Sequence, residues 1–106
     1  MHLHYKKVFL IPADRKGNWV FPKEIIASTE WLGSLWSKRQ HIANKDAIIL
    51  WGLKDLAFKE QELKIWKDLF KSAKVVTFAK AGHYVQEDMN ADLCPIIKSF
   101  VLDNMK

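Results

Sequence analysis

One histidine near the carboxyl end of the chain stands where it could act as a general base. His83 lies in the stretch "AKAGHYVQED", directly after a glycine. When a carboxylate binds one imidazole nitrogen, the other nitrogen is left free to take a proton near neutral pH. This chemistry needs an acidic partner, and Asp55 in "GLKDLAF" is the candidate. The alternative is purely structural, with a capping aspartate and a loop histidine that perform no chemistry.

Two short apolar segments are predicted to position this pair. "AIILW" at 47–51 is continuously apolar, which is typical of a strand buried in a parallel sheet. "KVVTFA" at 74–79 has the β-branched composition of a second strand. Between them, residues 59–70 carry apolar side chains at helical spacing. This order predicts a βαβ unit whose two strands are adjacent and parallel.

The spacing of the two candidate residues fits that unit. Asp55 comes four residues after Trp51 and His83 comes four residues after Ala79, where the predicted strands end. Parallel strands end at the same edge of a sheet, and neighbours lie about 4.8 Å apart. Open α/β sheets bind their ligands at this carboxyl edge. We therefore expect Asp55 and His83 to lie side by side.

The amino-terminal part of the chain has weaker signals. Residues 8–11 predict a short strand that Pro12 stops, and "DRKGNW" predicts a turn. "VFPKEI" predicts an irregular connection, because the residue before Pro22 is pushed out of the helical region. A helix capped by Ser28 or Thr29 is expected to run to about residue 42.

The carboxyl end predicts a loop followed by a helix. "AGHYVQED" is interpreted as the loop, and the helix is expected over about residues 90–102. Pro95 falls inside that helix and lacks a backbone donor, so we expect a kink or a later helix start. Cys94, beside it, is expected to be a small buried residue.

Together these residues form a recognisable pattern. "ILWGLKDLAF" followed by "AGHYVQED" resembles the carboxy-terminal part of α/β-hydrolases, especially the haloalkane dehalogenase-like group. The resemblance implies that Asp55 is the acid of a catalytic triad and that His83 is the base that activates water. Tyr84 departs from the family, where phenylalanine is common. "VFPKEII" at 20–26 is similar to the end of the family's cap region.

The resemblance implies an α/β fold that is partial. Residues 1–106 would form a single domain, with a cap-end-like segment and helix at 1–44 and a βαβα portion at 45–106. The family's nucleophile lies on a tight elbow between two glycines four positions apart, and it precedes the acid and the histidine in the chain. The glycines here are at 17, 33, 52 and 82, so no such elbow is present. We expect a fragment that is inactive alone.

Composition narrows the remaining possibilities. The 106 residues are 49% hydrophobic and 27% charged, which describes one ordinary globular domain. The net charge of +5 is scattered rather than clustered, so nucleic-acid binding is not expected. A single cysteine and no long apolar run predict a cytoplasmic protein without a membrane span or leader. No cofactor is implied. His2 and His4 could bind a metal, but no nearby acidic or cysteine ligand joins them, so no metal site is expected.

Partners follow from the missing half of the fold. A strand at 47–51 without its outer neighbour would expose an apolar edge, which invites pairing with another chain. We expect a homodimer or a complex with a complementing amino-terminal hydrolase portion, unless residues 8–11 fold back over this edge. A small-molecule substrate is expected only for the completed site, where Trp19 and Phe21 would line a pocket or simply pack. The alternative is a non-catalytic oligomerisation module derived from a hydrolase.

Overall fold

A computed structural model describes residues 8–105 of the protein. The chain divides into two compact units, of which the first ends at Lys38 and the second begins at Arg39. Among the described residues, only the second unit contains a β-sheet, and both candidate residues lie in it.

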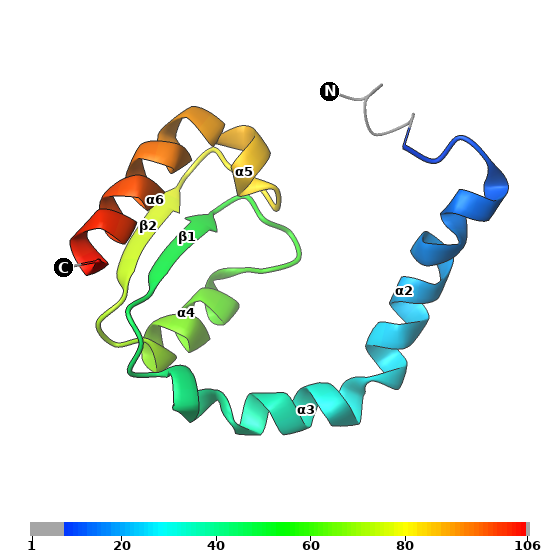
Figure 1. Ribbon diagram of the computed structural model, residues 1–106, viewed down its shortest axis with the longest axis horizontal. Helices are drawn as coiled ribbons and strands as arrows, with labels where there is room; N and C mark the ends of the chain where they lie inside the picture. Colours follow the sequence, from blue (N-terminus) through cyan, green and yellow to red (C-terminus); the bar gives the residue numbers. More distant parts are fainter. Residues whose placement is uncertain (1–7, 106) are drawn as a thin grey trace. The chain divides into compact units, whose positions relative to one another are not determined.

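The second unit is a βαβ unit followed by helices (Figure 1). Its elements in chain order are the 3₁₀ helix η2 (Arg39–Ile42), β1 (Ile48–Gly52), α4 (Glu60–Leu69), β2 (Lys74–Phe78), α5 (Val85–Asp88) and α6 (Asn90–Asn104). The two strands pair in parallel, from Ile48 opposite Lys74 to Gly52 opposite Phe78. The predicted parallel βαβ unit with flanking helices is therefore confirmed.

The core of this unit lies on one face of the sheet. Phe78, Ala81 and Leu93 are buried together, with Leu50 and Val76 of the strands packed against them. Leu50 and Val76 are partners in the strand register, so they point to the same face. The helix between the strands contacts β1 and buries Leu63 and Leu69. Side chains that alternate between the two faces of the strands, together with the apolar side chains of α4, thus account for the buried residues of this unit. These residues fix the two strands from whose carboxyl ends the loops begin.

The carboxyl end differs from the prediction at two places. Part of the expected loop "AGHYVQED" forms the one-turn helix α5, whose first residue is Val85. Pro95 lies inside α6, which begins before it at Asn90 and continues beyond it to Asn104. One missing backbone donor is outweighed by the packing of Leu93 against the core and of Ile96 beside it. Cys94 is exposed, not buried, because the helix turns that position away from the sheet.

From Pro12 to Ser37 the described part of the first unit consists of helices. Three predictions were wrong here. The elements of this unit are η1 (Pro12–Arg15), α2 (Lys16–Ala27) and α3 (Thr29–Ser37). Residues 8–11 form no strand, since in the described chain they have no partner strand to pair with. The segments expected as a turn and an irregular connection belong to η1 and α2, with Pro22 inside α2.

The boundary between α2 and α3 also differs from expectation. Ser28 makes no side-chain capping bond, and the Thr29 hydroxyl instead donates to the carbonyl oxygen of Ile26 at 2.7 Å. The helix expected to continue to residue 42 ends at Ser37, and η2 follows after one residue. The existence of a helix here was predicted correctly, but its cap and length were not.

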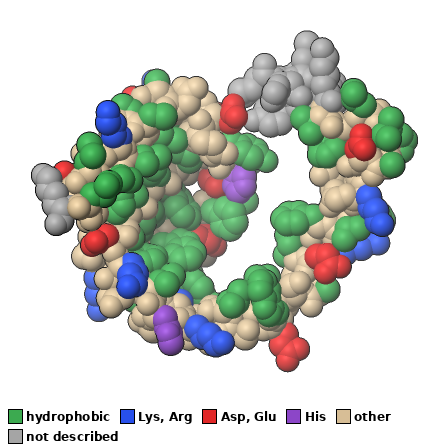
Figure 2. Space-filling model, viewed as in Figure 1, with side chains coloured by type: hydrophobic (Ala, Val, Ile, Leu, Met, Phe, Trp, Pro, Cys, Tyr) green, Lys and Arg blue, Asp and Glu red, His purple; other side chains and the backbone are tan. Residues whose placement is uncertain are grey.

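No described residue of the first unit is buried. Trp19 is 69% exposed, Phe21 66% and Trp31 61%, so apolar side chains lie at the surface of these helices (Figure 2). Trp19 is covered in part by Lys23, whose Nζ lies 4.5 Å from the ring centre. Among residues 8–105, no helix has the length and apolar character that a membrane crossing requires.

Candidate functional site

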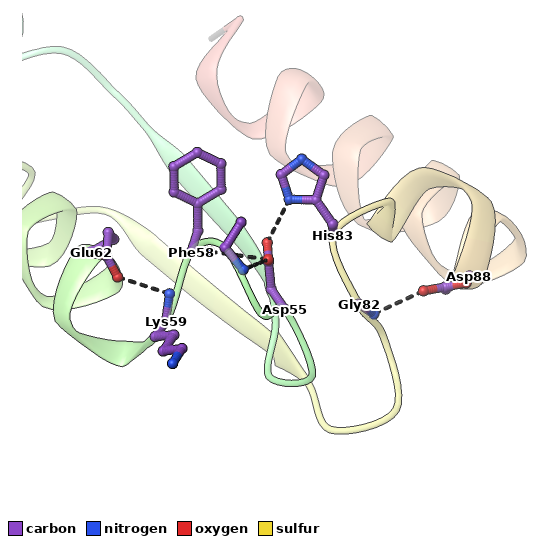
Figure 3. A network of polar contacts seen from close by, with 8 residues as sticks. Asp55, Phe58, Lys59, Glu62, Gly82, His83 and Asp88 are labelled. Carbon is purple, nitrogen blue, oxygen red and sulfur yellow. Dashed lines mark hydrogen bonds and ion pairs between the residues drawn. The ribbon is translucent and has the colours of Figure 1, made fainter. Parts of the chain in front are cut away.

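The structure brings Asp55 and His83 into direct contact. The Nδ1 of His83 lies 2.9 Å from the Oδ2 of Asp55, although 28 residues separate them in the chain (Figure 3). Asp55 comes from the loop after β1 and His83 from the loop after β2. Because the two strands are parallel, both loops begin at the carboxyl end of the sheet, as the spacing predicted. The catalytic roles of the two residues stay a prediction at this point.

The second carboxylate oxygen of Asp55 is held by its own loop. Oδ1 accepts the backbone N–H of Ala57 at 2.8 Å and that of Phe58 at 3.0 Å. An aspartate that binds the backbone two and three residues ahead is a common turn-forming arrangement. These bonds fix the carboxylate plane and leave Oδ2 facing His83. The carboxylate is therefore oriented before any ligand is present.

The same contacts set the charge of Asp55. Partial burial raises the pKa of its carboxyl group, but hydrogen bonds from Phe58, from the His83 side chain and from Ala57 favour the ionised form. The balance lowers the pKa below the ordinary value of 3.8. Asp55 is thus a carboxylate at neutral pH, which makes it an acceptor for an N–H at Nδ1 of His83. Nε2 then becomes the nitrogen without a fixed partner in the pair.

Two aromatic rings constrain the imidazole. Phe58 stacks on His83 with ring centres 5.4 Å apart and planes 18° apart. Tyr84 meets the same imidazole edge-on, at 5.2 Å and 83°. Such pairs favour defined ring orientations. The His83 side chain is nevertheless 46% exposed, compared with 10% for Asp55, so the free side of the imidazole is open to solvent.

Close backbone contact between the two loops makes this geometry possible. The Lys54 N–H donates to the Ala81 carbonyl at 2.9 Å. A Cβ added to Gly52 would meet the carbonyl oxygens of Gly82 and Ala81, the latter at 2.6 Å. The backbones can approach this closely only because Gly52 has no side chain.

The His83 loop has a further tie that the sequence analysis missed. The Gly82 N–H donates to the Oδ2 of Asp88 at 2.8 Å, which links the residue before His83 to the end of α5 (Figure 3). Phe58 and Asp88 were not selected from the sequence. A glycine at a strand end, and acidic residues just after a histidine loop, are the signals that could have indicated such loop-holding contacts.

An open hollow of about 820 Å³ lies beside the pair. Apolar side chains of the first loop line part of it, namely Trp51, Leu53, Leu56, Ala57 and Phe58. Asp55 also lines it, as does the start of α4, whereas His83 does not. The hollow therefore reaches the carboxylate and does not cover the imidazole.

Among residues 8–105, no group of three or more His, Cys, Asp or Glu side chains is arranged to hold a metal ion. His2 and His4 lie outside the described residues. The site formed by the described residues is thus an acid–histidine pair.

The chain is similar to proteins of a known family. Residues 25–89 match the family model described as the alpha/beta hydrolase fold. The chain is 37% identical over 62 residues to a cis-3-alkyl-4-alkyloxetan-2-one decarboxylase of Xanthomonas campestris, covering 58% of this chain and 21% of that protein. The corresponding enzyme of Shewanella oneidensis is 34% identical over 61 residues, covering 58% of this chain and 19% of the relative.

A second kind of relative matches a longer segment. Haloalkane dehalogenase 2 of Mycobacterium bovis is 30% identical over 87 residues, which is 80% of this chain and 30% of that protein. The matched segments span between 19% and 30% of these relatives. The recognised similarity to dehalogenase-like hydrolases is confirmed, whereas the activity of a whole relative does not transfer with it.

Proposed function

Because this chain belongs to the α/β-hydrolase fold family, we propose that Asp55 and His83 form the acid–base half of a hydrolase active site. The observation that carries the proposal is the 2.9 Å contact between Nδ1 of His83 and Oδ2 of Asp55 at the carboxyl edge of the sheet. Such a pair suits hydrolysis, since a carboxylate fixes the imidazole and leaves one nitrogen for proton transfer.

In this proposal each residue has a distinct role. Asp55 holds the proton on Nδ1 and stabilises the imidazolium that forms during the reaction. Nε2 of His83 removes a proton from water, and the resulting hydroxide attacks a covalent ester intermediate. Phe58 and Tyr84 keep the imidazole in the orientation that this transfer needs, through the ring contacts given above.

These 106 residues lack the sequence pattern of a nucleophile elbow. No glycine pair in the sequence is spaced as a nucleophile elbow requires. We therefore assign the nucleophile to residues outside this sequence, and expect the chain alone to release no halide from a haloalkane and no alcohol from a simple ester. Its single cysteine fits a reducing compartment, so the site is proposed to work in the cytoplasm.

A chimera tests these roles directly. In haloalkane dehalogenase 2 of M. bovis, the segment that this chain matches would be replaced with the matching segment of this chain. We expect halide release from the folded chimera, with a loss of about 100-fold or more in His83→Ala and a smaller loss in Asp55→Asn. His41→Ala is the matched control, because His41 is an exposed histidine of the same unit.

The outcomes separate a catalytic pair from a structural one. A chimera that is active with the native pair and equally active in His83→Ala would sink the proposal. Burst kinetics in His83→Ala, with a first halide released and no further turnover, would support the assignment of His83 to the water-attack step. Circular dichroism of every variant checks that the fold is retained.

A further inference from the structure

Both residues that flank His83 are bonded to Asp88. The Gly82 N–H donates to the Oδ2 of Asp88 at 2.8 Å (Figure 3), and the Asp88 N–H donates to the Tyr84 carbonyl at 3.0 Å. One residue at the end of α5 therefore holds the chain just before and just after the histidine. The bond to Gly82 joins an N–H to a carboxylate, and such charge-assisted bonds are roughly twice as strong as neutral ones.

The peptide group between Ala81 and Gly82 is held at both of its polar atoms. Its carbonyl oxygen accepts the Lys54 N–H at 2.9 Å, and its N–H is the one that Asp88 binds. The orientation of this peptide group sets the direction in which the chain continues into His83. Glycine has the widest range of backbone angles of any residue, so Gly82 is where this direction is least restricted. The bond to Asp88 therefore acts where the loop is most free to rotate.

The segment that carries Asp88 is anchored to the core of the second unit. Val85 and Met89 pack against the buried cluster that contains Phe78, and the Met89 N–H donates to the Val85 carbonyl at 2.9 Å. The Asp88 side chain is exposed, so the buried cluster does not depend on it. Removing the Asp88 carboxylate should therefore loosen the loop around His83 and leave the core intact.

We propose that Asp88 is a positioning residue for His83, which keeps Nδ1 of the imidazole on the Asp55 carboxylate. The bond between Nδ1 and Oδ2 is 2.9 Å long, and a hydrogen bond weakens steeply when its donor turns away from the acceptor. Asp88 acts through the backbone of the loop, whereas Asp55 bonds the imidazole itself. The inference rests on the proposed role of His83 as the base, and it adds the residue that keeps this base aligned.

Glu87 provides a matched comparison on the same helical turn. It is exposed like Asp88, and its N–H donates to the same Tyr84 carbonyl at 2.9 Å. The carboxylate that binds the Gly82 N–H belongs to Asp88, however. Glu87→Ala therefore removes the same charge from α5 and leaves the bond to Gly82 in place.

Nuclear magnetic resonance of the full 106-residue chain tests the proposal without any need for turnover. Proton–nitrogen correlation spectra at about pH 8, where an ordinary imidazole is neutral, show which ring nitrogen carries the proton. We expect this proton on Nδ1 of His83 in the native chain. In Asp88→Ala the Nδ1–H form should fall to a minority, because the imidazole loses its fixed place at the carboxylate. Asp88→Asn, whose amide oxygen can still accept the Gly82 N–H, should keep the native pattern, and so should Glu87→Ala.

The outcomes separate this inference from the proposed function. A native chain without the proton on Nδ1 contradicts the pair of Asp55 and His83, and the inference falls with it. If the native chain has that proton and Asp88→Ala keeps it, the inference alone is overturned. An equal loss in Glu87→Ala overturns it as well. If circular dichroism shows that Asp88→Ala does not fold, the scalar coupling across the hydrogen bond from the Gly82 nitrogen to the Asp88 carboxyl carbon decides in the native chain. Its presence supports the inference, and its absence overturns it.

Discussion

The two units of this chain contain apolar residues in similar variety but use them differently. Beyond Lys38, Phe78, Ala81 and Leu93 are buried together, and the strand loops meet in a defined pair. Up to Lys38, the described helices bury no residue at all, even though they include three of the five tryptophans. Apolar residues at helical spacing thus accompany a helix in both units, yet among the residues that the structure describes only the second unit has a core.

The difference lies in the partner that each apolar side chain finds. Two paired strands create a face on which α6 can pack. Leu50 and Val76 lie on this face, and they pack against the buried cluster that includes Leu93 of α6. A short helix has no such face within itself, and helices below about 12–15 residues are marginally stable alone in water. The 12 residues of α2 and the nine of α3 fall in this range. Stability should therefore be concentrated in the second unit.

Separating the units should produce the largest effect. We expect residues 39–106, expressed alone, to keep a cooperative thermal transition, since the core and the sheet lie within them. A peptide of residues 1–38 should lose most of its helical circular dichroism, because it brings no core. A strongly helical 1–38 peptide together with an unfolded 39–106 segment would show that the first unit is the more stable of the two, which contradicts this prediction.

Adding one methyl group to a glycine in each unit should have opposite results. Gly52→Ala places a Cβ against the carbonyls of Gly82 and Ala81, and we expect a loss of about 1–3 kcal/mol in unfolding free energy. Gly33→Ala meets nothing within 4 Å on an exposed helix, so α3 should gain up to about 1 kcal/mol in helix stability. Urea unfolding measures the first change, and far-UV circular dichroism the second. Equal tolerance of both substitutions would contradict the close approach of the two loops.

The pH dependence of Asp55 should give a smaller effect, confined to the second unit. Its pKa is lowered in the folded chain, so folding is stabilised where the carboxyl is ionised. The contribution should be complete well above the ordinary value of 3.8 and lost as pH falls through the lower folded-state pKa. In Asp55→Asn, the unfolding free energy should no longer contain the contribution of the Asp55 carboxyl group. It should therefore fall less between neutral and acid pH than in the native chain. A denaturant series at several pH values, run on the native chain and on Asp55→Asn, measures it.

Much of the site was predictable from residue type and spacing. The apolar run before Asp55, the β-branched run before His83 and the helix between them suffice for a parallel βαβ unit. That topology places Asp55 and His83 at one edge without any knowledge of distances. Phe58 and Asp88 could not be selected in this way, because their contacts with His83 and Gly82 depend on how each loop folds back.

The amino-terminal predictions were wrong for a related reason. The short run at 8–11 has a strand's composition, but a strand exists only through its hydrogen-bonded partner. Pro22 indicated a break, and the helix nevertheless runs through it. Local preference is a weak guide where few contacts decide between alternatives.

The sequence by itself determined the order of the elements, the parallel pairing and the candidate acid and base, because periodicity and chain order limit how a βαβ unit can close. Tertiary structure alone decided that the Asp55 carboxylate bonds Nδ1 of His83, and that Gly52 admits the His83 loop. These facts depend on positions within a few tenths of an ångström in loops that only close packing fixes, and residue types do not encode such positions one by one.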